Sequence, residues 1–151
     1  MDFVCCPLQK WLIPSFVVLL VAAGCGSQQP RTFPVRGRVT YPDGTPVTAG
    51  MVEFEPAPRE GAPLAERNNA RGRIHDDGSY SLTTFREDDG AVAGRHRVIV
   101  QEPYPDADLE AGRRRWKPSI DPSYRRYEES GLEFNVETEE NEITIVVTRP
   151  A

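Results

Sequence analysis

The 151-residue sequence has few residues of the types that build catalytic and metal sites, and it has no excess of positive charge. It contains only two histidines and three cysteines. Its 18 Lys and Arg residues are outnumbered by 23 Asp and Glu, for a formal net charge of -5. Nucleic-acid-binding domains usually carry a basic excess. The sequence therefore argues against a nucleic-acid partner and predicts one domain of ordinary globular composition.

The spacing of apolar residues in the sequence also gives no sign of long amphipathic helices. No segment keeps apolar residues at helical spacing for more than a turn or two, and no repeat of fixed period occurs. Fourteen prolines and twelve glycines favour frequent turns between short strands. We therefore expect an all-β fold.

One apolar run stands apart from this pattern, at the N-terminus. Residues 11–23 carry no charge and follow Lys10. In a helix this run rises only about 20 Å, which is short of the ~30 Å hydrocarbon core of a bilayer. A positive residue, a short apolar run and small residues after it are typical of an export signal.

The residues that end this run, Ala22-Ala23-Gly24-Cys25, resemble a bacterial lipobox. The resemblance implies that the thiol of Cys25 receives a diacylglyceryl group and that residues 1–24 are removed as a lipoprotein signal peptide. Residues 25–32 would then form a lipidated, palmitate-bearing cysteine and its tether, and two acyl chains satisfy the requirement for stable membrane anchoring. The alternative is a secreted protein cut after Ala23 or Gly24.

The residue after the cysteine bears on location. Gly26 follows Cys25, where inner-membrane retention in enteric lipoproteins uses Asp. We expect the outer membrane or the cell surface. With Cys5 and Cys6 removed and Cys25 lipidated, the exported chain has no thiol left for a disulfide and folds on its hydrophobic core alone.

Short strand patterns with alternating apolar residues fill the rest of the chain. We expect strands at residues 34–40, 51–56, 72–84, 93–101, 131–138 and 141–149. Asp77-Gly78 predicts a hairpin turn between Ile74 and the strand of Tyr80 and Leu82. The last two segments are expected to pair with each other. In 51–56, Val52 and Phe54 share one face and Glu53 and Glu55 lie on the opposite one. In 93–101, His96 shares an apolar face with two valines, which predicts a core position.

Several of these segments carry motifs that resemble carboxypeptidase regulatory-like domains. The motifs are Gly37–Val47 as an opening hairpin, Asp77–Leu82 as a "D-G-x-Y-x-L" hairpin, and Ala93–Val100, with His96 where an aromatic is usual. The resemblance implies a seven-stranded antiparallel Greek-key β-sandwich of the transthyretin-like (prealbumin-like) type over residues 33–149. It implies no catalytic residues, and no cofactor or metal is expected.

Marks of related or common enzymes are missing from the sequence. The Tyr-Arg-Gly-Ser ending of transthyretin-like hydroxyisourate hydrolases, a zinc-binding His-x-x-Glu pair and a Gly-x-Ser-x-Gly elbow do not occur. A degenerate hydrolase is therefore the least favoured function. His75 with Asp76 and Asp77 could form a metal corner, but a strand end with turn carboxylates is the preferred interpretation.

One long, proline-punctuated stretch concentrates basic and aromatic residues, and it is the candidate ligand or partner loop. Its residues are Arg113, Arg114, Arg115, Trp116, Tyr124, Arg125, Arg126 and Tyr127. Arginines beside aromatic rings can grip anionic or sugar surfaces. The alternative is a solvated loop whose Trp116 packs back on the sandwich.

Together these observations predict a non-catalytic, lipid-anchored protein of the cell envelope with a structural or protein-interaction role. Its partners would be the membrane, through Cys25, and an envelope protein or glycan. A carbohydrate-binding module at the cell surface is the alternative, with Trp116, Tyr124 and Tyr127 as its platform.

Overall fold

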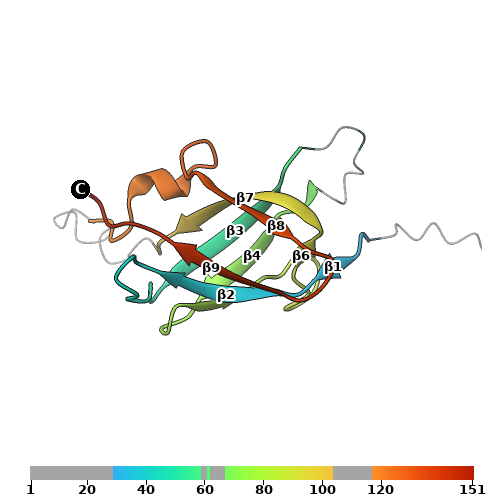
Figure 1. The fold of residues 1–151 in the computed structure, drawn as a ribbon, viewed down its shortest axis with the longest axis horizontal. Helices are drawn as coiled ribbons and strands as arrows, with labels where there is room; N and C mark the ends of the chain where they lie inside the picture. Colours follow the sequence, from blue (N-terminus) through green and yellow to red (C-terminus); the bar gives the residue numbers. More distant parts are fainter. Residues whose placement is uncertain (1–28, 59–60, 62–66, 104–116) are drawn as a thin grey trace, which may run out of the picture.

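The computed structural model describes residues 29–58, 61, 67–103 and 117–151 (Figure 1). The strands are β1 (Thr32–Phe33), β2 (Val35–Thr40), β3 (Gly50–Pro56), β4 (Ala70–Ile74), β5 (Ser79–Ser81), β6 (Ala91–Val92), β7 (Gly94–Gln101), β8 (Leu132–Val136) and β9 (Asn141–Val146). The one helical element among the described residues is the short 3-10 helix η2 (Pro122–Arg125). The all-β expectation is therefore confirmed. No helix in the described ranges is long and apolar enough to cross a membrane.

The described residues form nine strands, so the predicted number of seven is wrong. Two of the nine, β1 and β6, are two residues long and pair only with each other. Such short strands carry too few residues for an alternating pattern, which is why the sequence did not predict them.

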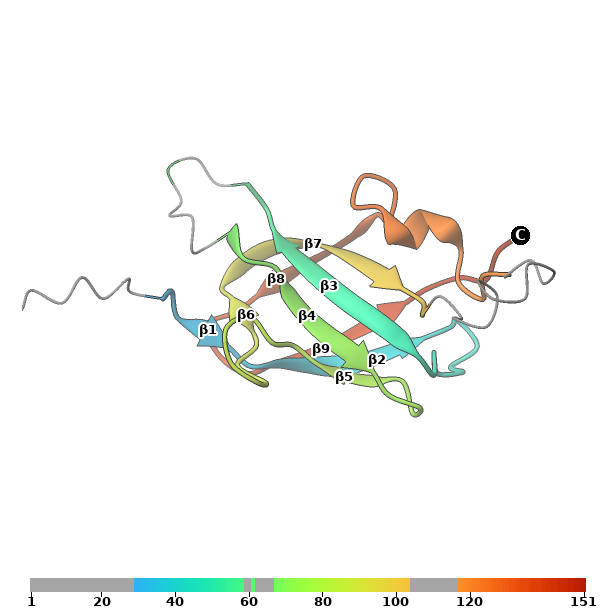
Figure 2. The same cartoon turned by 180° about the vertical axis from the view of Figure 1, so that it is seen from behind.

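The other strands form a three-stranded sheet, in the order β5-β2-β9, and a four-stranded sheet, in the order β4-β3-β7-β8. Figures 1 and 2, which view the molecule from opposite sides, show β2 and β9 in front in one view and β3 and β4 in front in the other. All strand pairs are antiparallel except β2 with β9, which is parallel. A purely antiparallel arrangement was therefore an incorrect expectation.

Two predicted hairpins separate into different sheets. The Asp77-Gly78 turn forms as expected, with the Gly78 amide donating to the His75 carbonyl at 2.9 Å. Arg71 and Thr83 also exchange two backbone hydrogen bonds across this hairpin, but β4 forms its ladder with β3 and β5 forms its ladder with β2. The two closing strands likewise do not pair with each other, since β8 joins β7 and β9 joins β2. Turn residues determine where the chain reverses, whereas partner choice depends on long-range packing.

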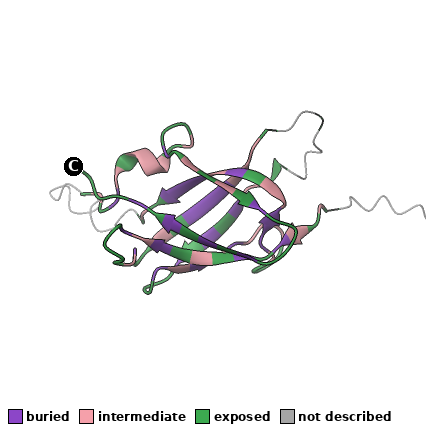
Figure 3. Ribbon diagram, in the orientation of Figure 1, coloured by how far each residue is buried: buried purple, intermediate pink, exposed green. Residues whose placement is uncertain are grey.

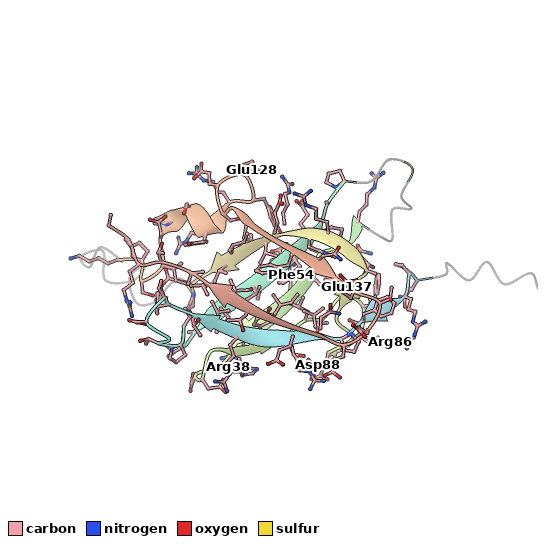
Figure 4. The ribbon with its side chains drawn as sticks, viewed as in Figure 1. Arg38, Phe54, Arg86, Asp88, Glu128 and Glu137 are labelled. Carbon is pink, nitrogen blue, oxygen red and sulfur yellow. The ribbon has the colours of Figure 1, made fainter. Side chains whose placement is uncertain are left out.

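One hydrophobic core takes side chains from both larger sheets. At its centre the ring of Phe54 lies 6.5 Å from that of Tyr80, 5.9 Å from that of His96 and 6.1 Å from that of Phe134. Figure 3 shows the buried residues concentrated on the facing strands, and Figure 4 shows Phe54 in the interior. The predicted alternation is confirmed in β7, where His96, Val98 and Val100 are all buried.

The three-stranded sheet depends on the absence of a side chain at Gly37. Gly37 lies opposite Tyr80 of β5 and opposite Ile143 of β9. A Cβ atom at this position would lie 1.8 Å from the Ile143 carbonyl oxygen. The same oxygen accepts a 2.8 Å hydrogen bond from the buried Tyr80 hydroxyl. Glycine therefore lets β9 lie close to β2 at this point.

Candidate functional site

The predicted site residues divide into two groups. Cys25 and the run Arg113, Arg114, Arg115 and Trp116 lie outside the described residues. The second part of the candidate loop, Tyr124 to Tyr127, lies in a segment that we call the strap, residues 117–130. The strap contains η2, which packs against β7 (Figure 1).

Contacts along its whole length hold the strap to the two sheets. Ile120 is buried in the core at 2% exposure. The Asp121 amide donates to the Thr148 carbonyl at 2.9 Å, and the Asp121 side chain accepts the Ser123 amide at 2.9 Å, which caps η2. The Tyr41 hydroxyl donates to the Ser119 carbonyl at 3.2 Å.

Within the predicted loop, the first three described side chains, Tyr124 to Arg126, differ in how far they are engaged with the rest of the molecule. The half-buried ring of Tyr124 packs against the core. Arg125 lies 3.5 Å from Glu102, whose side chain is 9% exposed. Arg126 is exposed and pairs with Glu129. Of these three, only Arg126 presents its charged group mainly to solvent.

Tyr127 reaches across to the outer face of the four-stranded sheet and meets a buried carboxylate. Glu53 of β3 accepts hydrogen bonds from Asn69 at 2.6 Å and from Arg71 at 3.0 Å. The Tyr127 hydroxyl accepts a hydrogen bond from Asn69 at 3.3 Å and lies beside the Glu53 carboxylate, whose pKa it helps to lower. These contacts join the strap to the start of β4 and the middle of β3.

The protonation states at this cluster follow from its surroundings. Burial by itself raises the pKa of Glu53, but hydrogen bonds from Asn69 and Arg71 outweigh burial and hold the pKa below its ordinary value of 4.5. Burial and the charge of Glu53 raise the pKa of the Tyr127 hydroxyl. At neutral pH, Glu53 is therefore an ionised acceptor and Tyr127 a neutral hydroxyl.

A second set of charges lies beside this cluster on the same face. Arg97 of β7 pairs with Glu55 and lies 3.9 Å from Glu128 of the strap. Its guanidinium carbon is 5.4 Å from the centre of the Tyr127 ring. Arginine over an aromatic face is a favourable cation–π arrangement. The arrangement fastens the strap to the sheet, and its charged groups are already paired.

The two histidines occupy contrasting places. His75 is exposed at the turn after β4, whereas His96 is 1% exposed in the core. The Nδ1 atom of His96 lies 2.9 Å from the Gly94 carbonyl oxygen, so Nδ1–H donates and Nε2 is left buried without a partner. Burial lowers the pKa of His96. In the described ranges no group of three or more His, Cys, Asp or Glu side chains could hold a metal ion.

The outer face of the three-stranded sheet is more open. A groove of about 460 Å³ crosses it, lined by Arg36, Arg38, Ser79, Ser81 and Glu142, among others. Arg36 pairs with Glu140 at 2.9 Å and Arg38 lies 3.9 Å from Asp77. The groove therefore mixes both signs of charge, which does not select an ionic ligand class.

Sequence reasoning identified Tyr127 but missed the residues that bind it. It placed Glu53 and Glu55 on the outward face of their strand, which is confirmed, and outward glutamates are usually solvated. Glu53 is nevertheless 8% exposed, because the strap lies over it. No local pattern reports a contact between residues so far apart in the chain.

The fold and the site together define an all-β protein with a strap bound to one sheet. No protein-family model, curated protein or solved structure significantly matches this chain.

Proposed function

We propose that this chain is a non-catalytic lipoprotein of the bacterial cell envelope, anchored by the lipid on Cys25 and acting through protein interactions. The observation that carries the proposal is the position of Cys25 between the uncharged apolar run of residues 11–23 and the fold. The first strand begins at Thr32, only a short tether after the cysteine. A lipid on this residue holds the folded domain directly at a membrane surface.

The proposal includes a transthyretin-like Greek-key β-sandwich of the carboxypeptidase regulatory-like type. The three- and four-stranded sheets together hold seven strands and share one core, and the chain crosses repeatedly between them. These features support a sandwich.

A non-catalytic role is supported by the state of the polar side chains. His96 is buried against Phe54 and bonded to a backbone carbonyl, so a substrate does not reach it. The carboxylate of Glu53 is bound by Asn69 and Arg71. These two groups, which could transfer protons, are thus engaged in holding the fold.

The geometry favours an interaction role over a glycan platform. A platform needs exposed aromatic faces, but Tyr124 packs against the core and Tyr127 lies under Arg97. An interaction role leaves the exposed Arg126 and the preceding Arg113, Arg114 and Arg115 to contact an acidic partner.

Metabolic labelling with a palmitate analogue tests the anchor. The label is expected on the wild-type protein and on the control Cys5→Ala, and it is expected to be lost in Cys25→Ala. Lipid attachment requires the thiol of Cys25, whereas Cys5 is removed with the signal. Unchanged labelling of Cys25→Ala would contradict the proposal.

Pulldown from the envelope tests the partner surface. Replacing Arg113, Arg114 and Arg115 by Ser is expected to reduce recovery of a bound envelope protein. The control replaces three exposed arginines elsewhere, Arg36, Arg73 and Arg86, and carries the same change in net charge. Equal recovery from both variants would show that the loop is not the partner surface.

A further inference from the structure

The outer edge of β9 has no strand beside it. In the order β5-β2-β9, β9 is a terminal strand, and its only ladder is with β2. The amides of Asn141 and Val147 donate toward β2, to the carbonyls of Pro34 and Thr40, each at 2.9 Å. Backbone groups alternate in direction along a strand. The N–H and C=O groups of Glu142, Thr144 and Val146 therefore point away from β2.

The strap closes one end of this edge and leaves the rest open. Beyond β9, the Thr148 carbonyl accepts the Asp121 amide of the strap. Between Glu142 and Val146, the outward backbone groups have no partner in the part of the chain that the structure describes. Unpaired edges of this kind are templates for another strand.

Of the three outward residues along the open edge, Glu142 is charged, whereas Thr144 and Val146 do little to prevent pairing. Natural edges are usually protected by lysine, proline, a bulge or inward charges. Here Thr144 and Val146 are exposed and β-branched, and Val146 is 47% exposed, one of two large apolar residues at the described surface. β-branched residues favour strand pairing.

We propose that β9 pairs with β9 of a second copy of this chain, antiparallel about a twofold axis at Thr144. Each outward residue then both donates to and accepts from the opposite strand, as in a narrow antiparallel pair. The two three-stranded sheets become one continuous sheet. A twofold arrangement is the commonest form of self-association.

The charges along the chain support this register. Pairing about Thr144 places Glu142 opposite Val146 of the second copy, within the part of the edge that the strap leaves open. The acidic start of the strand thus meets the neutral end of its neighbour. A register shifted toward the start of the strand would set glutamates against each other, which is unfavourable.

The pairing is compatible with the proposed lipid anchor, although it does not depend on it. In an antiparallel pair of β9 strands, the N-terminal ends of the two copies of the chain lie at opposite ends of the joined sheet. A six-residue strand spans about 20 Å. The residues from Cys25 to Arg31 can extend about 23 Å. When the paired β9 strands lie parallel to a membrane, the lipid groups of both copies can therefore reach that membrane.

Disulfide trapping tests the register in the full chain. Cα atoms of a narrow antiparallel pair lie about 5.5 Å apart, within the range that a disulfide spans. Thr144→Cys is expected to give about tenfold more covalent dimer on air oxidation than the control Asn135→Cys, an exposed position on the edge strand β8. Equal amounts of dimer from the two variants would overturn the register.

Charge substitution at one position tests the pairing itself. Val146→Glu faces Glu142 of the second copy, whereas Val146→Lys faces it with the opposite charge. Sedimentation of the full chain in detergent is expected to show a dimer dissociation constant about tenfold higher for Val146→Glu than for Val146→Lys. Equal constants, or a wild-type chain that stays monomeric at every concentration, would overturn the proposal and leave the edge to a strand of another protein.

Discussion

Two ion pairs, one on each sheet, have almost the same geometry and different surroundings. On the four-stranded sheet, Arg71 lies 3.0 Å from Glu53, and on the three-stranded sheet, Arg36 lies 2.9 Å from Glu140. The side chain of Glu53 is 11% exposed, whereas that of Glu140 is 62% exposed. Burial and the additional donors at Glu53, more than distance, decide what each pair contributes to stability.

The difference arises from the strap. On the four-stranded sheet, Tyr127 of the strap is hydrogen-bonded to Asn69, a partner of Glu53, and Glu53 is only 8% exposed. No comparable described segment lies over Arg36, which borders an open groove. The same in-out alternation of side chains therefore gives one buried and one solvated outer face.

The largest effect on stability is expected from a substitution that disrupts the three-stranded sheet, which carries the exposed Arg36–Glu140 pair. Gly37→Ala places a Cβ atom 1.8 Å from the Ile143 carbonyl oxygen, so β9 must move away from β2. We expect a loss of about 3 kcal/mol in the free energy of unfolding, measured by urea denaturation.

Gly44→Ala is the matched control. Gly44 has φ of +81° but no heavy atom within 4 Å of its added Cβ. We expect a loss of only about 1 kcal/mol from backbone strain. Similar losses for the two variants would show that close packing of β2 on β9 is not what requires glycine at position 37.

The second prediction concerns the buried pair directly. Glu53→Gln keeps the shape of the side chain but removes the charge that Arg71 and Asn69 bind. We expect a loss of about 2 kcal/mol, since hydrogen bonds to charged groups contribute about 1.5 to 3 kcal/mol each. Tyr127→Phe, which removes the hydroxyl bonded to Asn69 and leaves the strap's ring in place, is expected to cost less.

Acid titration of the same variant gives the sign of the effect. The pKa of Glu53 is lowered in the folded state, so its contribution is complete above the ordinary value of 4.5 and is lost as the pH falls through the folded pKa. Glu53→Gln is therefore expected to differ from wild type at neutral pH and to approach it in acid. A constant difference at all pH values would contradict an ionised, bound Glu53.

The third prediction uses the one histidine that lies between the two sheets. The pKa of His96 is lowered by burial, so the unfolded chain binds a proton first as the pH falls below about 6.5. Stability then decreases by up to about 1.4 kcal/mol per pH unit until the folded pKa is reached. In His96→Phe this slope should disappear. An unchanged slope between pH 6.5 and 5 would assign it to other groups.

Particular residues show how much of the fold and of the candidate site can be predicted from the sequence. Alternation correctly placed Val52 and Phe54 inward and Glu53 outward, and Asp77-Gly78 correctly marked a turn. These features are local, because strand geometry and turn chemistry act over a few residues.

The features that failed are long-range. The sequence predicted that the last two strands pair, but β9 lies parallel to β2, more than a hundred residues earlier. It also did not predict that Tyr127 would cover Glu53. The pairing of strands and the covering of Glu53 by the strap both depend on the packing of the whole core, and no short sequence pattern contains that information.

The exposed pair carries the smallest expected effect and completes the comparison. Glu140→Gln removes the partner of Arg36, and both side chains are more than 60% exposed. Water and salt screen such a pair, so we expect a change below about 0.5 kcal/mol, and less still in 0.5 M salt. Glu53→Gln is expected to keep most of its larger effect in the same salt, because its carboxylate is buried. If both variants lost stability equally and with equal salt dependence, the strap would not be what separates the two faces.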